Sequence, residues 1–160
     1  LIQKPHLKRS LFSVPFDDEG VATREFPLLQ SGRFEQFLCD SYSARRLGSA
    51  VTGTAGGVFN VRIEAPTVSF EDLLKQLDCG LVVTEMMGQG VNFMNGDFSK
   101  GAGGFWVEKG VIQYPVDGIT IAANLLEMFT GIIACGHDYD NRGTLQLGSV
   151  LLNEMTISSS

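Results

Sequence analysis

Few residues in this chain of 160 could bind a metal ion or activate a nucleophile. The sequence contains two histidines, His6 and His137, and three cysteines. Cys135 and His137 are two positions apart, so both would lie on one face of a β-strand and could bind a metal ion together. A catalytic metal site needs two or three such ligands and an open position for water, and no third ligand is nearby in the sequence. The alternative is a histidine at a loop edge beside a core thiol.

Four other side chains are candidates for contact with a peptide or a partner. Glu85 follows an apolar β-branched run, and Asn92 and Asp97 flank a turn. These three could form a polar groove that holds an extended peptide by strand addition, or they could satisfy the hydrogen bonds of turns and strand ends. Trp106 could anchor an interface or lie in the core. No Gly-x-Ser-x-Gly elbow occurs, so the sequence nominates no nucleophile.

Two further stretches have the composition of a ligand loop but not its spacing. The acidic run from Asp17 to Gly20 lacks the alternating oxygen ligands of a calcium loop, and its residue types favour a turn. The glycines between Gly53 and Gly57 precede a strand-like segment. A phosphate loop has the opposite order, with a strand first and a helix after the glycines, so we do not expect nucleotide binding.

Length and composition indicate one globular domain over residues 1–160, without a membrane span. The net charge of −6 and the pI near 4.8 count against nucleic acid as a partner. The three cysteines are widely spaced in apolar surroundings, which is typical of buried free thiols in a reducing cytoplasm. The chain begins at Leu1 without a secretory leader, so we expect it to start inside a longer protein.

Tight turns and alternating residues predict an α+β fold, mostly antiparallel sheet with hairpins and at least two helices. Asn95-Gly96 and Lys109-Gly110 should each connect two antiparallel strands, and Ser31-Gly32-Arg33 should close a third hairpin. Leu11–Phe16 is expected to be a short strand. The last strand region is expected from Ser149 to Ile157.

Helices are expected in three places. Ser69–Asp78 has an N-capping serine, acidic residues in its first turn and Gly80 as a C-terminal cap. Apolar residues at helical spacing predict a second helix over Thr120–Thr130, which ends at Gly131. One or two helical turns are expected over Ser41–Leu47, closed by Gly48.

Several motifs of this chain resemble the TldD/PmbA family, and specifically its PmbA (TldE) branch. They are TEMMGQGVN, GDFSKGAGGFWVEKGVIQYPV, ITIAANL and GSVLLNEM, with PFDDEGV, SYSARRLG and GTAGG upstream. They follow one another in order along most of the chain, which resembles the C-terminal domain of such proteins.

The resemblance implies a peptidase system that depends on zinc. In the TldD branch a His-Glu-x-x-x-His motif and a cysteine near the C-terminus bind zinc. This sequence has no such motif, and Leu147 stands near the place where that cysteine would align. The PmbA branch is understood as the non-metal subunit of a TldD–PmbA heterodimer, also labelled a modulator of DNA gyrase. We therefore expect no cofactor in this chain, zinc in a TldD-like partner, and a peptide or unfolded protein as substrate.

Two alternatives stay open at this stage. The full-length protein could be a metallopeptidase in its own right, with ligands upstream of these residues. It could also be a self-associating structural domain without a catalytic role.

Overall fold

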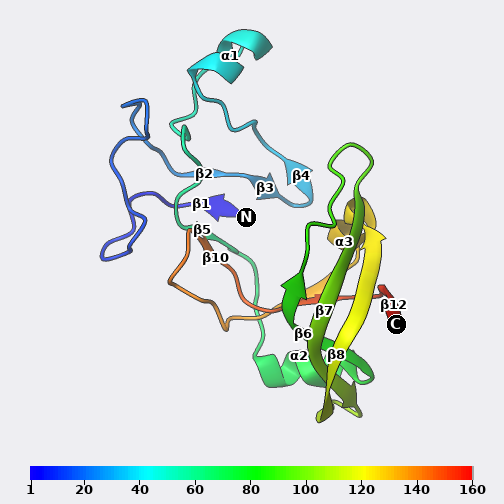
Figure 1. Cartoon of the computed structure of the whole chain (residues 1–160). Helices are drawn as coiled ribbons and strands as arrows, with labels where there is room; N and C mark the ends of the chain where they lie inside the picture. The colour runs from blue at the N-terminus through cyan, green and yellow to red at the C-terminus, as the bar shows by residue number, and fades with distance from the viewer. Residues whose placement is uncertain (160) are drawn as a thin grey trace. The chain divides into compact units, whose positions relative to one another are not determined.

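The computed structural model describes residues 1–159 (Figure 1). Contacts between residues divide the chain into two compact units. Unit 1 consists of Leu1–Pro66 and Asp138–Gly148, and unit 2 consists of Thr67–His137 and the segment that starts at Ser149. The single domain expected from the length stays a prediction, because a division by contacts does not show whether either unit folds alone.

Unit 1 contains a small four-stranded sheet, a hairpin and one helix. The sheet has the strand order β10-β5-β1-β2, and it is antiparallel except between β10 and β5. The elements are β1 (Ile2–Gln3), β2 (Phe26–Pro27), β3 (Leu29–Gln30), β4 (Arg33–Phe34), α1 (Ser41–Leu47), β5 (Val61–Arg62) and β10 (Leu145–Gln146). Helix α1 begins where the Asp40 side chain accepts a hydrogen bond from the Ser43 N–H and ends at left-handed Gly48, as predicted.

Hydrogen-bonded polar side chains fill much of the interior of unit 1. Gln3, Asn60 and Gln146 are all at least 99% buried. Each amide is hydrogen-bonded, as a buried polar group must be if it is not to destabilise the fold. Strands of two residues bury little apolar surface, so these buried amides form a larger part of the interior than they would beside a larger sheet.

The acidic run at residues 17–20 forms a turn around one buried carboxylate. The two Asp17 carboxylate oxygens accept hydrogen bonds from the main-chain N–H groups of Glu19, Val21 and Ala55 at 2.9–3.0 Å. Burial raises the pKa of Asp17, but the hydrogen bonds from Ala55, Val21 and Glu19 outweigh burial and hold the pKa below its usual 3.8. Asp17 therefore stabilises the turn that the residue types of this stretch predict.

Unit 2 is built on a four-stranded antiparallel sheet with the strand order β12-β8-β7-β6. Long strands β7 and β8 form its centre, and β6 and β12 form its edges (Figure 1). The elements of unit 2 are α2 (Phe70–Leu77), β6 (Gly80–Met87), β7 (Asp97–Glu108), β8 (Val111–Asn124), α3 (Leu125–Thr130), β9 (Ile132–Cys135), β11 (Val150–Leu152) and β12 (Thr156–Ser159). Strands β9 and β11 pair separately as a two-stranded antiparallel sheet.

The β7–β8 hairpin closes with the two-residue turn predicted at Lys109-Gly110. Lys109 has φ 52° and Gly110 has φ 70°, and Glu108 pairs with Val111. Two positive φ values in succession are typical of the type I′ turn, whose twist matches that of the strands. The Gly110 N–H also donates to the Asp78 carbonyl at 2.8 Å, so the turn is attached to the end of α2.

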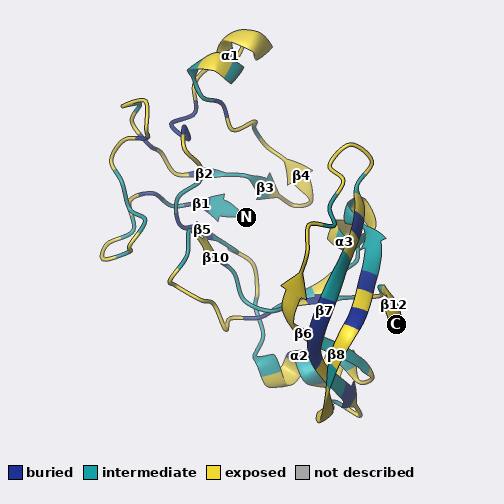
Figure 2. Ribbon diagram, viewed as in Figure 1, coloured by how far each residue is buried: buried dark blue, intermediate teal, exposed yellow. Residues whose placement is uncertain are grey.

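One face of this sheet carries the apolar core of unit 2. Phe98, Ala102, Ile119 and Ile121 are buried there, and Leu125 and Met128 of α3 pack against them. Figure 2 shows buried and exposed residues alternating along part of β8, where Ile119 and Ile121 are buried and Thr120 is exposed. That part of β8 has the period of two of a half-buried strand, whereas β7 is buried continuously over residues 102–104.

The α+β fold class is confirmed, and several of the predicted elements need correction. Thr120–Thr130 is helical only from Leu125, because β-branched Ile119 and Ile121 alternate with smaller residues and are buried between β7 and β12. Helix α2 begins after its predicted cap Ser69 but ends at Asp78, which has φ 52°, rather than at Gly80.

Leu11–Phe16 forms no strand in the described structure apart from a single bridge between Phe16 and Ala22. The predicted strand region over 149–157 is divided into β11 and β12 by Asn153, Glu154 and Met155. The hairpin predicted at Ser31-Gly32-Arg33 is present. Its loop has two residues instead of three, because Arg33 belongs to β4.

The cysteines and the helices test two expectations from the sequence. Cys39 is buried and Cys135 is half-buried, whereas Cys79 is exposed, so the prediction of three buried thiols is wrong for Cys79. All three are free thiols. In residues 1–159, no helix has the length and apolar character needed to cross a membrane.

Candidate functional site

Glu85 lies on the edge strand β6 of the unit 2 sheet, next to a second carboxylate that the sequence did not point to. It is exposed and pairs with Gly103 on β7. A Cβ atom at Gly103 would be 2.9 Å from Glu85 Oε1 and 3.3 Å from Asp117 Oδ1. The glycine therefore leaves space in which carboxylates from β6 and β8 approach one another.

Two irregularities in strand pairing bring these carboxylates together. The register shifts between Val83 and Glu85 on β6 and between Ala102 and Gly104 on β7. The second shift places Asp117 and Gly118 of β8 opposite the single residue Gly103 of β7, which is the arrangement of a β-bulge. The Gly118 N–H donates to Asp117 Oδ1 at 2.7 Å, which fixes the direction of that carboxylate.

Asn92 and Asp97 hydrogen-bond within the loop before β7. Asn92 Oδ1 accepts from the Met94 N–H at 3.0 Å, and the Asn92 N–H donates to the Asp97 carbonyl at 2.8 Å. Asp97 Oδ2 accepts from Asn95 Nδ2 at 2.6 Å. The turn is wider than the predicted two residues, because Gly96 donates to the Asn92 carbonyl. Within residues 1–159, neither side chain hydrogen-bonds to Glu85.

Trp106 is half-buried on β7, where it pairs with Leu81 and Tyr114 on the neighbouring strands. Its indole Nε1 donates to Glu108 Oε1 at 3.0 Å. The ring thus combines partial exposure with a hydrogen-bonded polar end, and it belongs neither fully to the core nor fully to the surface.

The most exposed apolar side chains of unit 2 are at the loop between β6 and β7. Phe93 is 87% exposed and Met94 is 95% exposed. Met86 and Met87, at the end of β6, are also more than half exposed. Large apolar side chains gathered in this way are typical of a surface that another protein segment covers.

Cys135 and His137 follow one another along β9 and its continuation. The main-chain N–H of His137 donates to the Val68 carbonyl, and its side chain is exposed. Burial raises the pKa of the Cys135 thiol, so the thiolate that a metal would require is disfavoured. Among the residues that the structure describes, no three His, Cys, Asp or Glu side chains are grouped to hold a metal ion.

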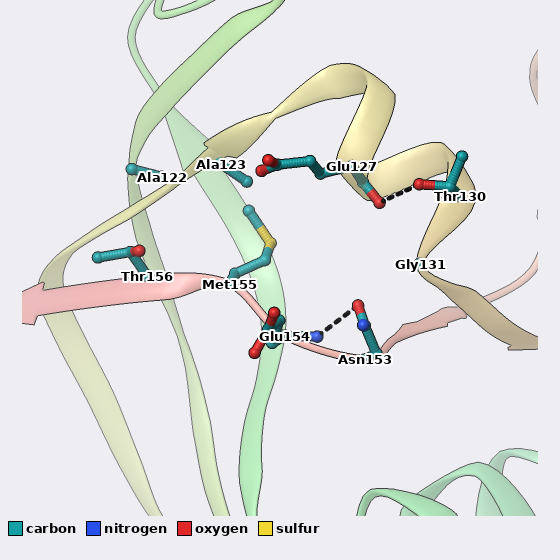
Figure 3. A pocket seen from close by; sticks show the side chains of 9 residues that line it. All are labelled: Ala122, Ala123, Glu127, Thr130, Gly131, Asn153, Glu154, Met155 and Thr156. Atoms are coloured by element: carbon teal, nitrogen blue, oxygen red, sulfur yellow. Dashed lines mark hydrogen bonds between the residues drawn. The ribbon is translucent and has the colours of Figure 1, made fainter.

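A cavity of about 530 Å³ lies between β8, α3 and the segment before β12 (Figure 3). Two carboxylates and two hydroxyls dominate its lining, which suits a cationic or hydrogen-bond-donating group. The polar and sulfur-bearing residues of the lining are Glu127, Thr130, Asn153, Glu154, Met155 and Thr156. Sequence reasoning missed this cavity, because its two sides are about 30 residues apart and meet only through the pairing of β12 with β8.

The strand order and hairpins define an α+β domain built on antiparallel sheet, with acidic and apolar groups along one sheet edge. The chain belongs to the family described as the PmbA/TldA metallopeptidase C-terminal domain, whose model matches residues 1–159. This confirms the resemblance found in the sequence motifs.

Individual relatives agree with this assignment. The chain is 53% identical to Metalloprotease PmbA of Escherichia coli O157:H7 over 156 residues, which cover 98% of this chain and 35% of that protein. The chain thus spans about a third of the length of the curated relative. A crystal structure from Thermotoga maritima, of a proposed modulator of a DNA gyrase, has a TM-score of 0.85 at 36% identity over 98% of this chain and 38% of the other. TldE from Thermococcus kodakarensis has a TM-score of 0.82 at 26% identity over 99% of this chain and 39% of the other.

Proposed function

We propose that this chain is the C-terminal domain of a cytoplasmic subunit that pairs with a TldD-like zinc peptidase and itself holds no zinc. The substrate of the pair would be a peptide or an unfolded protein. Family membership and the likeness to a protein named TldE support this assignment. The net charge of −6 counts against nucleic acid as the partner.

The observation that carries the proposal is the amount of surface that the chain exposes. Its accessible area is 10477 Å². Two separate folded units of half this mass would together expose only about 9,400 Å². The excess of about 1,100 Å² is comparable to the roughly 800 Å² that each partner buries in a standard protein interface. The β6–β7 loop with Phe93 and Met94 is the most apolar part of this surplus in unit 2.

Glu85 and the edge strand β6 provide a place for a peptide. An edge strand offers main-chain groups to an added strand, and pockets or charges beside it select side chains. Glu85 and Asp117 would favour a basic residue of the peptide above Gly103. Asn92 and Asp97 would shape the loop at the end of this edge, and Trp106 would stack against a partner or peptide side chain.

Copurification of the full-length protein with a TldD-like protein tests the pairing. We expect a stable complex in light scattering, with zinc and peptidase activity only when both proteins are present. Met94→Asp should weaken the complex about tenfold or more, since it places a charge in an apolar contact. Val111→Asp is the matched control, because Val111 is 59% exposed at the other end of the hairpin. A homo-oligomer that ignores the TldD-like protein would refute the pairing and favour a structural, self-associating role.

The name of the E. coli relative favours a second candidate function, in which the protein is a metallopeptidase in its own right. Its ligands would then come from residues upstream of this chain. Stoichiometric zinc and peptide cleavage by the full-length protein alone would establish this second candidate and exclude the first.

A further inference from the structure

Unit 1 contains a cavity of about 300 Å³ whose lining includes three cationic residues. Lys8 and Arg9 come from the loop after β1, and Arg62 comes from β5. The other side chains that matter for its chemistry are Leu7, Leu11 and Gln146. Positive charge is thus gathered from two segments more than 50 residues apart in the sequence.

A buried amide network holds the Arg62 guanidinium in place. Arg62 Nε donates to Gln146 Oε1 at 2.6 Å. Gln146 is 99% buried, and its Nε2 donates to Asn60 Oδ1 at 3.1 Å and to Ser10 Oγ at 3.2 Å. The terminal Nη1 and Nη2 groups of Arg62 donate no hydrogen bond within residues 1–159. A fixed guanidinium with free N–H groups is pre-organised to bind a planar anion through two parallel hydrogen bonds.

The three cations are not neutralised by the protein. The ion pairs of the described residues involve Lys4, Lys75 and Arg142 instead. Eighteen acidic residues outnumber twelve basic ones in the chain, yet the four ion pairs found within residues 1–159 do not include Lys8, Arg9 or Arg62. Like charges repel one another, so three cationic residues around one cavity of an acidic protein favour an external anion.

The remaining wall of the cavity is apolar. Leu7 and Leu11 line it, and Leu11 is 78% exposed. A bare inorganic anion would leave this wall in contact with water. An organic acid with an apolar group next to its carboxylate would satisfy both parts of the lining at once.

We propose that this cavity binds the C-terminal carboxylate of a peptide whose last residue is apolar. The carboxylate lies against the Arg62 fork, with Lys8 and Arg9 adding charge, and the terminal side chain contacts Leu7 and Leu11. The choice of a peptide as the ligand rests on the proposed function, whereas the carboxylate chemistry rests on the cavity alone. The cavity belongs to unit 1, whereas Glu85 belongs to unit 2.

Fluorescence anisotropy tests this proposal with the full-length protein and an N-terminally labelled peptide that ends in leucine. No TldD-like partner and no activity readout are needed, so a failure of the pairing leaves this result interpretable. We expect the peptide with a free carboxylate to bind about tenfold or more tightly than its C-terminal amide. Unlabelled acetyl-leucine should compete better than acetate or inorganic phosphate, because only acetyl-leucine fills the apolar wall.

Variants connect the binding to these residues. Arg62→Gln should weaken the peptide acid about tenfold and leave the amide unchanged, and Arg62→Lys should lie between, since lysine keeps the charge and loses the fork. Lys8→Gln changes an exposed side chain without touching the amide network and should weaken binding less. Arg33→Gln is the matched control, an exposed arginine of the same unit. Equal affinity for acid and amide, stronger competition by phosphate than by acetyl-leucine, or unchanged binding in folded Arg62→Gln would each overturn the proposal.

Discussion

Replacement of Gly104 by alanine should be among the most damaging single-methyl changes in unit 2. A Cβ atom at Gly104 would overlap the Val82 carbonyl oxygen and lie 2.9 Å from the Val82 carbonyl carbon and 3.1 Å from Val83 Cα. Carbon atoms in contact prefer separations of about 3.5–4.0 Å, and the overlap with the carbonyl oxygen is larger than the overlap with either carbon, so β6 would have to move by about 1 Å or more. All three atoms belong to the main chain, so no change of rotamer can relieve the overlap. We expect a loss of about 3 kcal/mol in the free energy of unfolding, the upper end for overpacking.

Gly101→Ala provides the control in the same strand. A Cβ atom there would meet Met87 Cβ at 3.6 Å, which is an ordinary contact. This variant should be neutral or up to about 1 kcal/mol more stable, because alanine restricts the unfolded chain. Urea unfolding of both variants gives the comparison, and hydrogen exchange should show faster exchange along β6 only in Gly104→Ala. Equal stability of the two variants would refute the close approach of β6 to β7 at Gly104.

Three further predictions concern turns and charges. The free energy of unfolding should fall as the pH drops below about 4, because the lowered pKa of Asp17 means that the folded state binds the carboxyl proton more weakly than the unfolded state does. Asp17→Asn should make the free energy of unfolding less dependent on pH in acid titrations. Lys109→Gly should stabilise the protein by roughly 0.5–1 kcal/mol in thermal unfolding, since glycine adopts the positive φ of this turn without strain. A hydrogen bond from Arg142 lowers the pKa of Asp140 to about 2, so Arg142→Gln should return its NMR titration midpoint towards 3.8.

The elements that could be predicted from the sequence are those fixed by local chemistry. The Ser69 cap, the Gly48 terminator and the Lys109-Gly110 turn each depend on neighbouring residues alone, and all three are found as predicted. The helix predicted over Thr120–Thr130 is wrong before Leu125, because the apolar residues of this segment fit both a helical and an alternating pattern. Pairing of Ile121 with Lys100 on β7 and Ile157 on β12 selects the strand, and that pairing is not local.

The candidate sites show the same limit. Glu85 was identified from its position after an apolar run, but its neighbour Asp117 was not, because a bulge 30 residues later in the chain brings the two together. Arg62 and Gln146 are 84 residues apart and meet only through the parallel pairing of β5 with β10. The signal that could have found the cationic cavity is the clustering of Lys8 and Arg9 in an otherwise acidic chain.

The order of strands in unit 2 has a consequence for the protein during its synthesis. Helix α2 and strands β6, β7 and β8 follow one another without interruption over residues 70–124, so they can assemble as soon as they leave the ribosome. The other neighbour of β8 is β12, which is made some 30 residues later. Until then β8 presents an unpaired edge with Ile119 and Ile121 beside it, which is the stage at which a chaperone would have most to protect.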